Sequence, residues 1–112
     1  MSAVAVLCYH SQILTGNDYA GNGHIALAAD LEALHIAGAR IIPAAAVAAW
    51  LRGELGFADA AHRVALTFDD GSLLDFADVE HPQFGRQRGF AGILEDFRDR
   101  HGHRAQPELH AT

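Results

Sequence analysis

Lysine is absent from this 112-residue chain, and Cys8 is its only cysteine. A single cysteine cannot form an internal disulfide, so nothing in the sequence requires an oxidising compartment. The eight basic residues, all arginine, are outnumbered by 14 acidic ones, which gives a net charge of −6. This balance argues against a nucleic-acid-binding protein, because such proteins normally carry a basic face.

Long apolar runs and targeting signals are also lacking. The alanine-rich segment 44–51 is far shorter than the roughly 20 residues that span a bilayer. Residues 1–9 are mostly apolar, but no basic segment precedes them and no small-residue cleavage site follows them. We therefore expect a soluble, cytoplasmic protein that binds neither membranes nor nucleic acid. A secreted protein whose signal is missing from the sequence is the alternative.

The residues that are present favour an α/β fold. Half of them are hydrophobic, which supports a packed core, and the length suits one domain or part of one. The apolar segments 4–9 and 64–68 are typical of short strands buried on both faces. Apolar residues at helical spacing predict helices over 25–37, 44–55 and 89–100. Strands that are joined through helices can pair in parallel, so we expect a parallel sheet with flanking helices.

Both predicted strands end in side chains that can do chemistry. Tyr9 and His10 follow the first strand, and Asp69 and Asp70 follow the second. Because parallel strands end at the same edge of a sheet, these groups are expected to share one edge. Successive side chains point to opposite faces, so one carboxylate could bind a cation while the other acts as a base. A solvated Asp-Asp-Gly turn is the purely structural alternative.

Cys8 and segment 72–88 are both expected to have structural roles. Cys8 lies inside the first predicted strand, where we expect a buried, inert residue rather than a nucleophile. Segment 72–88 shows no regular period and is expected to be a long irregular insertion, which could cover the edge of the sheet. Phe76 and Phe84 are expected to pack it down, and its two arginines to pair with nearby acids.

The string Thr67-Phe68-Asp69-Asp70-Gly71 resembles the first motif of the polysaccharide deacetylases, the family with a NodB-homology domain (carbohydrate esterase family 4). All five positions match that motif. Tyr9-His10 also resembles the Tyr-His pair with which many members begin. The resemblance implies the N-terminal part of a distorted (β/α) barrel. Residues 1–112 are then expected to be the N-terminal portion of one truncated catalytic domain.

The resemblance also implies an activity and roles for three residues. Members use a divalent metal, usually zinc, to remove acetyl or similar groups from amino sugars, so they hydrolyse carbon–nitrogen bonds other than peptide bonds. Asp69 would be the general base that activates water, and Asp70 would be a metal ligand. His10 would contact the substrate, an N-acylated carbohydrate, or support the metal site.

The sequence departs from the family pattern after this motif. The family's two metal-binding histidines belong to a His-x-x-x-His motif that has no counterpart here, and His101 and His103 have the wrong spacing. Catalytic zinc sites take three protein ligands and a water. We therefore expect the remaining ligands beyond Thr112. By itself the chain should bind zinc weakly, turn over no substrate, and expose strand edges through which copies could associate.

Two other functions stay open. The chain could be a non-catalytic remnant or interaction module of the same fold, whose sheet pairs with another chain. It could also be a different metal-dependent α/β hydrolase, such as a phosphoesterase that binds its metal through the two aspartates.

Overall fold

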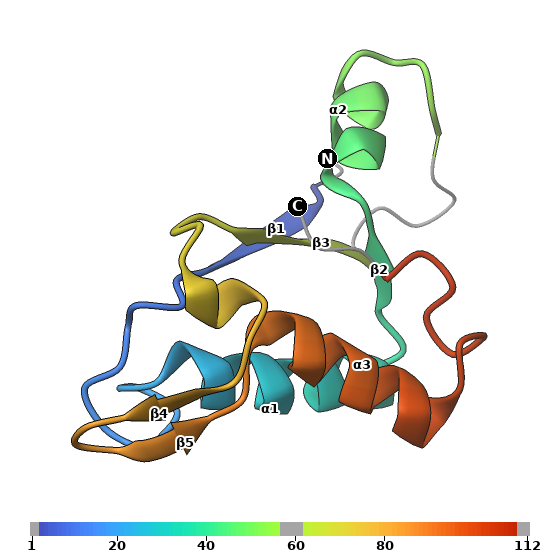
Figure 1. Cartoon of the computed structure of the whole chain (residues 1–112). Helices are drawn as coiled ribbons and strands as arrows, with labels where there is room; N and C mark the ends of the chain where they lie inside the picture. Colours follow the sequence, from blue (N-terminus) through green and yellow to red (C-terminus); the bar gives the residue numbers. More distant parts are fainter. Residues whose placement is uncertain (1–2, 57–61, 110–112) are drawn as a thin grey trace.

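The computed structural model describes residues 3–56 and 62–109. A parallel sheet of three strands lies at its centre (Figure 1), in the order β1 (Ala5–Tyr9), β3 (Arg63–Phe68), β2 (Arg40–Ile42). The predicted parallel pairing of the first strand with the Arg63–Phe68 strand is confirmed. Within the described residues the sheet stays open, with β1 and β2 as its edges, and no barrel is closed. The observed fold is thus a small mixed α/β domain.

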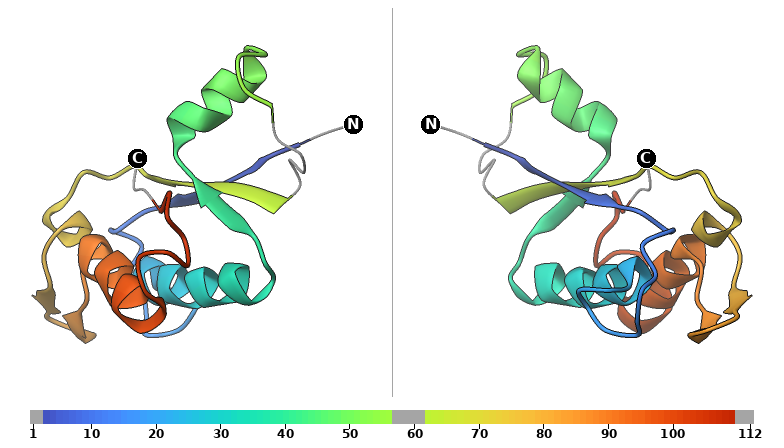
Figure 2. Two further views of the ribbon diagram at one scale, coloured as in Figure 1. Left: turned by 90° about the vertical axis from the view of Figure 1, so that its right-hand side faces the viewer. Right: turned by 90° about the vertical axis from the view of Figure 1, so that its left-hand side faces the viewer.

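Three helices flank this sheet near the predicted positions, but the second ends at Leu51 and not at residue 55 as predicted, because Gly53 has a left-handed backbone with φ +77°. They are α1 (Gly23–Ile36), α2 (Ala44–Leu51) and α3 (Phe90–His101). Helices α1 and α3 pack against each other on one side of the sheet, and α2 lies on the other side (Figure 2). None of the described helices is both long enough and apolar enough to cross a membrane.

The segment predicted to be an irregular insertion has regular structure, so that prediction is wrong. It contains a short 3-10 turn, η2 (Leu73–Asp75), and an antiparallel hairpin of β4 (Val79–His81) and β5 (Gly85–Gln87). Each strand has only three residues, too few to show an alternating pattern in the sequence. The left-handed backbone of Gly85, with φ +79°, forms the turn where a side chain would be strained.

Salt bridges hold this hairpin in place. The Asp78 carboxylate accepts hydrogen bonds from Arg86, Arg88 and the Gly89 N–H, and Arg88 also binds Asp96 on α3. The predicted local pairing of the two arginines is confirmed. Phe76 does not pack the segment down, because 76% of its surface is exposed.

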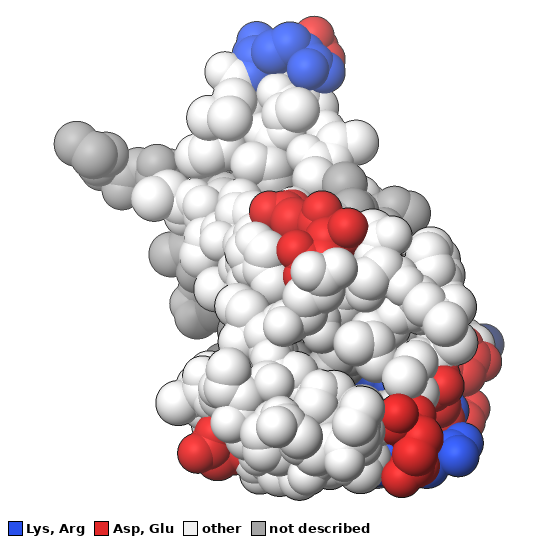
Figure 3. Space-filling view, turned by 60° about the vertical axis from the view of Figure 1, so that its left-hand side comes forward, with Lys and Arg blue, Asp and Glu red and all other residues white. Residues whose placement is uncertain are grey.

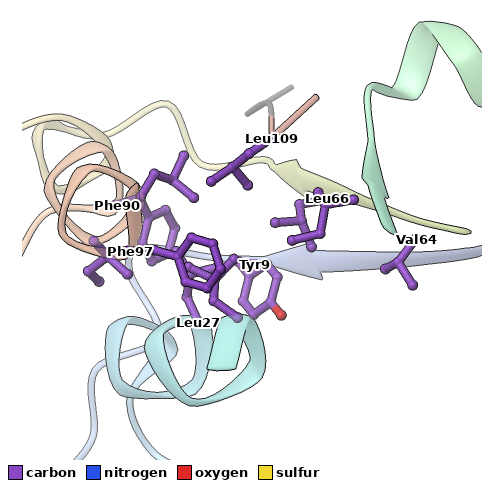
Figure 4. Packing of buried hydrophobic residues seen from close by; sticks show 11 residues of the cluster. Tyr9, Leu27, Val64, Leu66, Phe90, Phe97 and Leu109 are labelled. Atoms are coloured by element: carbon purple, nitrogen blue, oxygen red, sulfur yellow. The ribbon is translucent and has the colours of Figure 1, made fainter. Parts of the chain in front are cut away.

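The core fills the space between the sheet and the pair α1 and α3. Figure 4 shows Phe90 and Phe97 of α3 facing Leu27 of α1, with Tyr9 and Leu66 contributed by the sheet. The ring of Tyr9 meets that of Phe90 edge-on, at a centroid distance of 6.4 Å. Aromatic pairs in this arrangement add to the free energy gained by burying their area.

Strand β1 is not buried on both faces, which corrects the prediction from its apolar sequence. Val6 is 50% exposed and Cys8 is also exposed, whereas Tyr9 is buried. The reason is the position of β1 at an edge of the sheet, where α1 and α3 cover only one face. Helix α2 packs on the other face against β3.

One carboxylate links the end of β1 to α1. Asp30 accepts a hydrogen bond from the Tyr9 hydroxyl and another from the Tyr19 hydroxyl, both at 2.7 Å. Burial, followed by the hydrogen bond to Asp30, raises the pKa of Tyr9 well above its usual range. The hydrogen bond to Asp30 also raises the pKa of Tyr19.

The raised pKa values of Tyr9 and Tyr19 predict that the folded protein loses stability at alkaline pH. In the unfolded chain these tyrosines ionise near pH 10, whereas the folded protein keeps them protonated to higher pH. Stability that is fully present below pH 10 is therefore lost as the pH rises above it. Urea unfolding measured from pH 8 to pH 11 should show this decline, and Tyr9→Phe should flatten it. An equal decline in both proteins would contradict the assignment to Tyr9.

Candidate functional site

Cys8, His10 and Asp69 meet at the carboxyl-terminal ends of β1 and β3. The Cys8 thiol donates a hydrogen bond to Asp69 Oδ2 at 2.9 Å, and His10 Nε2 lies 3.7 Å from the same oxygen. One potential metal-binding atom from each residue lies within 4.8 Å of the other two. The predicted proximity of His10 and Asp69 is confirmed, and Cys8 joins them.

The pairing of the two strands explains why these side chains converge. Cys8 is opposite Thr67 in the register, so the two share a face of the sheet. His10 and Asp69 are each two residues further along, and a period of two returns to the same face. The alternate residues, Tyr9 and Phe68, point into the core. The same alternation that builds the core thus gathers the three polar groups on the open face.

Asp70 has different surroundings, as its position next to Asp69 predicts. Its Oδ2 accepts a hydrogen bond of 2.8 Å from the backbone N–H of Gln12. Beside it, the hydroxyls of Ser11 and Ser72 are hydrogen-bonded at 2.6 Å. Both contacts join the loop after β1 to the turn after β3. Asp70 is therefore engaged in holding the two loops together.

The carboxylates at this edge have no arginine partner among the described residues. Neither Asp69 nor Asp70 forms an ion pair with an arginine there, and the side chains that approach Asp69 are the Cys8 thiol and the His10 ring. The side chains of His10 and Asp69 are 41% and 54% exposed. On the face shown in Figure 3, an acidic group without basic neighbours lies within a mostly uncharged surface. The hydrogen bond to Asp69 raises the pKa of the Cys8 thiol.

A cavity of about 230 Å³ opens beside two of the three residues. Cys8 and His10 line it together with Tyr9, Tyr19 and Asp30, among others. Its volume is slightly below the range of typical small-molecule sites. A larger cavity of about 280 Å³ lies around the hairpin and is lined by none of the strand-end residues. The smaller cavity is therefore the one that could hold a substrate next to Cys8 and His10.

Two other histidines, His24 and His101, have structural contacts instead. His24 Nε2 lies 3.0 Å from the Ser11 carbonyl oxygen, so this nitrogen donates a hydrogen bond to it. His101, the last residue of helix α3, pairs with Glu32 at 2.8 Å. Neither is close enough to the strand ends to complete the group there.

Sequence reasoning missed Cys8 because it treated the first strand as buried on both faces. The signal that identifies the cysteine is its spacing, since Cys8 and His10 are two residues apart on one face of a strand. The exposure of that face depends on where the helices pack, which the local sequence does not specify.

No family model, curated protein or solved structure matches the chain. The likeness to polysaccharide deacetylases therefore rests on the motif 67–71 and on the Tyr9-His10 pair. Function has to be inferred from these residues and from their arrangement at the strand ends.

Proposed function

We propose that the chain carries the metal and water site of a metal-dependent hydrolase. The bond cleaved is the non-peptide carbon–nitrogen bond of an N-acylated sugar, and the fold is the N-terminal part of a NodB-type barrel. The main support is the convergence of Cys8, His10 and Asp69, whose potential donor atoms lie within 4.8 Å of one another. The deacetylase-like motif that contains Asp69 and Asp70 adds to it.

The residues present fit a divalent metal, and zinc best. Zinc accepts cysteine sulfur, histidine nitrogen and carboxylate oxygen, and catalytic zinc sites have three such ligands and an open fourth position. Cys8 thus offers a third donor beside His10 and Asp69. Bound there, the cation would polarise the acyl carbonyl and lower the pKa of a bound water.

The neighbouring groups suit the handling of a sugar. The family resemblance assigns proton transfer from water to Asp69 and metal binding to Asp70, whereas the group of three donors contains Asp69 and not Asp70. His10 lines the small cavity, where it can contact a bound acyl sugar. The hydroxyl of Tyr19 and the carboxylate of Asp30 line the same cavity, and both groups can bond to sugar hydroxyls. A cytoplasmic location suits the site, because a reducing compartment keeps an exposed thiol in its reduced form.

An activated ester tests this proposal more sharply than an amide does. Cleavage of an amide needs a proton for the leaving amine, whereas an aryl oxide leaves without one. Because the family's later motifs are missing from the sequence, we expect amide turnover by these 112 residues below detection. Zinc-dependent hydrolysis of an aryl acetate should be measurable, with several acetates released per chain. Release of one aryl oxide per chain without release of acetate would instead indicate that the acetyl group has been transferred to the Cys8 sulfur.

Two variants provide the comparison. Asp69→Asn should lower the zinc-dependent rate by about 100-fold or more, the range expected for loss of a general base or of the metal. Asp99→Asn, which changes an exposed carboxylate on α3, should leave the rate unchanged. Equal rates for the Asp69 variant and the parent chain would show that the strand-end site does not perform the hydrolysis.

A further inference from the structure

We infer that Cys8, His10 and Asp69 are the metal ligands of this chain and that Asp70 is not one of them. The inference rests on the metal site of the proposed function, although it does not depend on the hydrolysis itself. It reverses the assignment that the family resemblance implies, in which the second aspartate binds the metal and the first remains free as the base.

Asp70 is already occupied by a contact within the fold. Its Oδ2 holds the Gln12 N–H at 2.8 Å, and it is not part of the group of three donors. This bond fixes the orientation of the carboxylate, and neither of its two oxygens belongs to the group of three donors, so turning Asp70 towards a metal at Cys8 and His10 would disturb the bond to Gln12. A backbone N–H that loses its partner costs free energy unless water replaces the partner.

The cluster balances the charge of a divalent cation. On binding, the Cys8 S–H bond breaks, its proton passes to water, and the thiolate sulfur forms the bond to the metal. One thiolate, the Asp69 carboxylate and a neutral His10 together carry a charge of about −2, which a dication neutralises. No arginine pairs with Asp69 in the described ranges 3–56 and 62–109, so the carboxylate does not have to leave a basic partner.

The distances allow coordination with small movements. Bonds of about 2.0–2.3 Å to a tetrahedral zinc place two ligand atoms roughly 3.3–3.6 Å apart. The two measured separations from Asp69 Oδ2 are 2.9 Å to Cys8 Sγ and 3.7 Å to His10 Nε2. The remaining separation, between Cys8 and His10, is no more than 4.8 Å. Since His10 and Asp69 are about half exposed, rotation of their side chains meets little resistance from packing.

A thiolate ligand also determines which metals bind. Soft sulfur ligands select zinc and similar transition metals, whereas magnesium and calcium prefer sites made of oxygen atoms. The inferred site should therefore bind zinc and cobalt and discriminate against magnesium.

Cobalt reports directly on a sulfur ligand, so the test is a titration of the full chain with Co²⁺. We expect one equivalent to bind with a thiolate-to-cobalt charge-transfer band in the near ultraviolet, unaffected by excess Mg²⁺. Cys8→Ser should remove that band and weaken binding by about 100-fold or more, and Asp69→Asn should weaken binding similarly. Because Cys8 and Asp69 are exposed, we expect both variants to fold. Circular dichroism checks this.

Asp70→Asn is the matched control, because the asparagine side-chain oxygen can still accept the Gln12 N–H. It should keep both the band and the affinity. A parent chain without the charge-transfer band would overturn the inference, as would loss of cobalt binding in the Asp70 variant alongside normal binding in the Cys8 variant. An intact cobalt spectrum in a protein without zinc-dependent ester hydrolysis would refute the proposed function and leave the inferred ligands in place.

Discussion

Replacing Phe97 by alanine is expected to lower the free energy of unfolding by about 3–5 kcal/mol, the usual cost of removing a buried phenylalanine ring. Phe97 is fully buried on α3. Its ring lies 4.7 Å from that of His101 and 5.5 Å from that of His35 on α1, measured between centroids. Removal of the ring leaves a cavity between the two helices that cover the sheet. Domains of this size are stable by about 5–15 kcal/mol, so a large part of the stability would be lost.

Urea unfolding followed by circular dichroism measures this loss, and the chain contains its own control. Phe76 is the same residue type at 76% exposure, so Phe76→Ala should change the free energy of unfolding by no more than about 0.5 kcal/mol. Similar losses in the two variants would mean that the core does not lie between α1, α3 and the sheet.

The strands and helices that carry a clear apolar period could be predicted from the sequence. Helix α3 repeats large apolar residues at helical spacing, and β3 is a short, continuous apolar run. Their predicted positions agree with the structure to within about two residues. The parallel pairing followed from the helices that join the strands, because such connections return the chain in the same direction.

The hairpin and the exposed face of β1 could not be predicted, because distant contacts determine both. Gln87 of β5 is buried, and its side chain forms hydrogen bonds with Asn17 and Asn22, which lie 70 and 65 residues away in the chain. A run of apolar residues such as β1 has the same local sequence whether one or both of its faces are covered. Only the packing of α1 and α3 shows that Cys8 is on the open side.

The part of the candidate site that follows from the pairing of the strands could be predicted, and the part that depends on a backbone contact could not. Parallel strand ends predicted that His10 and Asp69 would be close together, and they are. The contact that separates Asp70 from this group involves the backbone N–H of Gln12, and every residue except proline has such a donor. No pattern of side-chain types could therefore have indicated it.

Asn22→Ala is expected to destabilise the protein by about 2–4 kcal/mol, because this fully buried residue has two roles. Its side-chain oxygen caps α1 by accepting the N–H groups of His24 and Ile25, and loss of such a cap costs about 0.5–2 kcal/mol. Its amide nitrogen donates to the buried Gln87. Leaving that partner unsatisfied costs about 1–3 kcal/mol more.

Comparison with two other variants separates these roles. Asn22→Ser keeps an oxygen that can cap the helix and should recover the smaller, capping part of the loss. Asn17→Ala removes another partner of Gln87 at an exposed position, so water can replace it and the loss should be below about 1 kcal/mol. Equal stability of the alanine and serine variants at position 22 would show that the cap contributes nothing. Because Asn22 ends the loop that begins after His10, faster amide exchange over residues 11–21 in Asn22→Ala would show that this residue also orders the loop beside the candidate site.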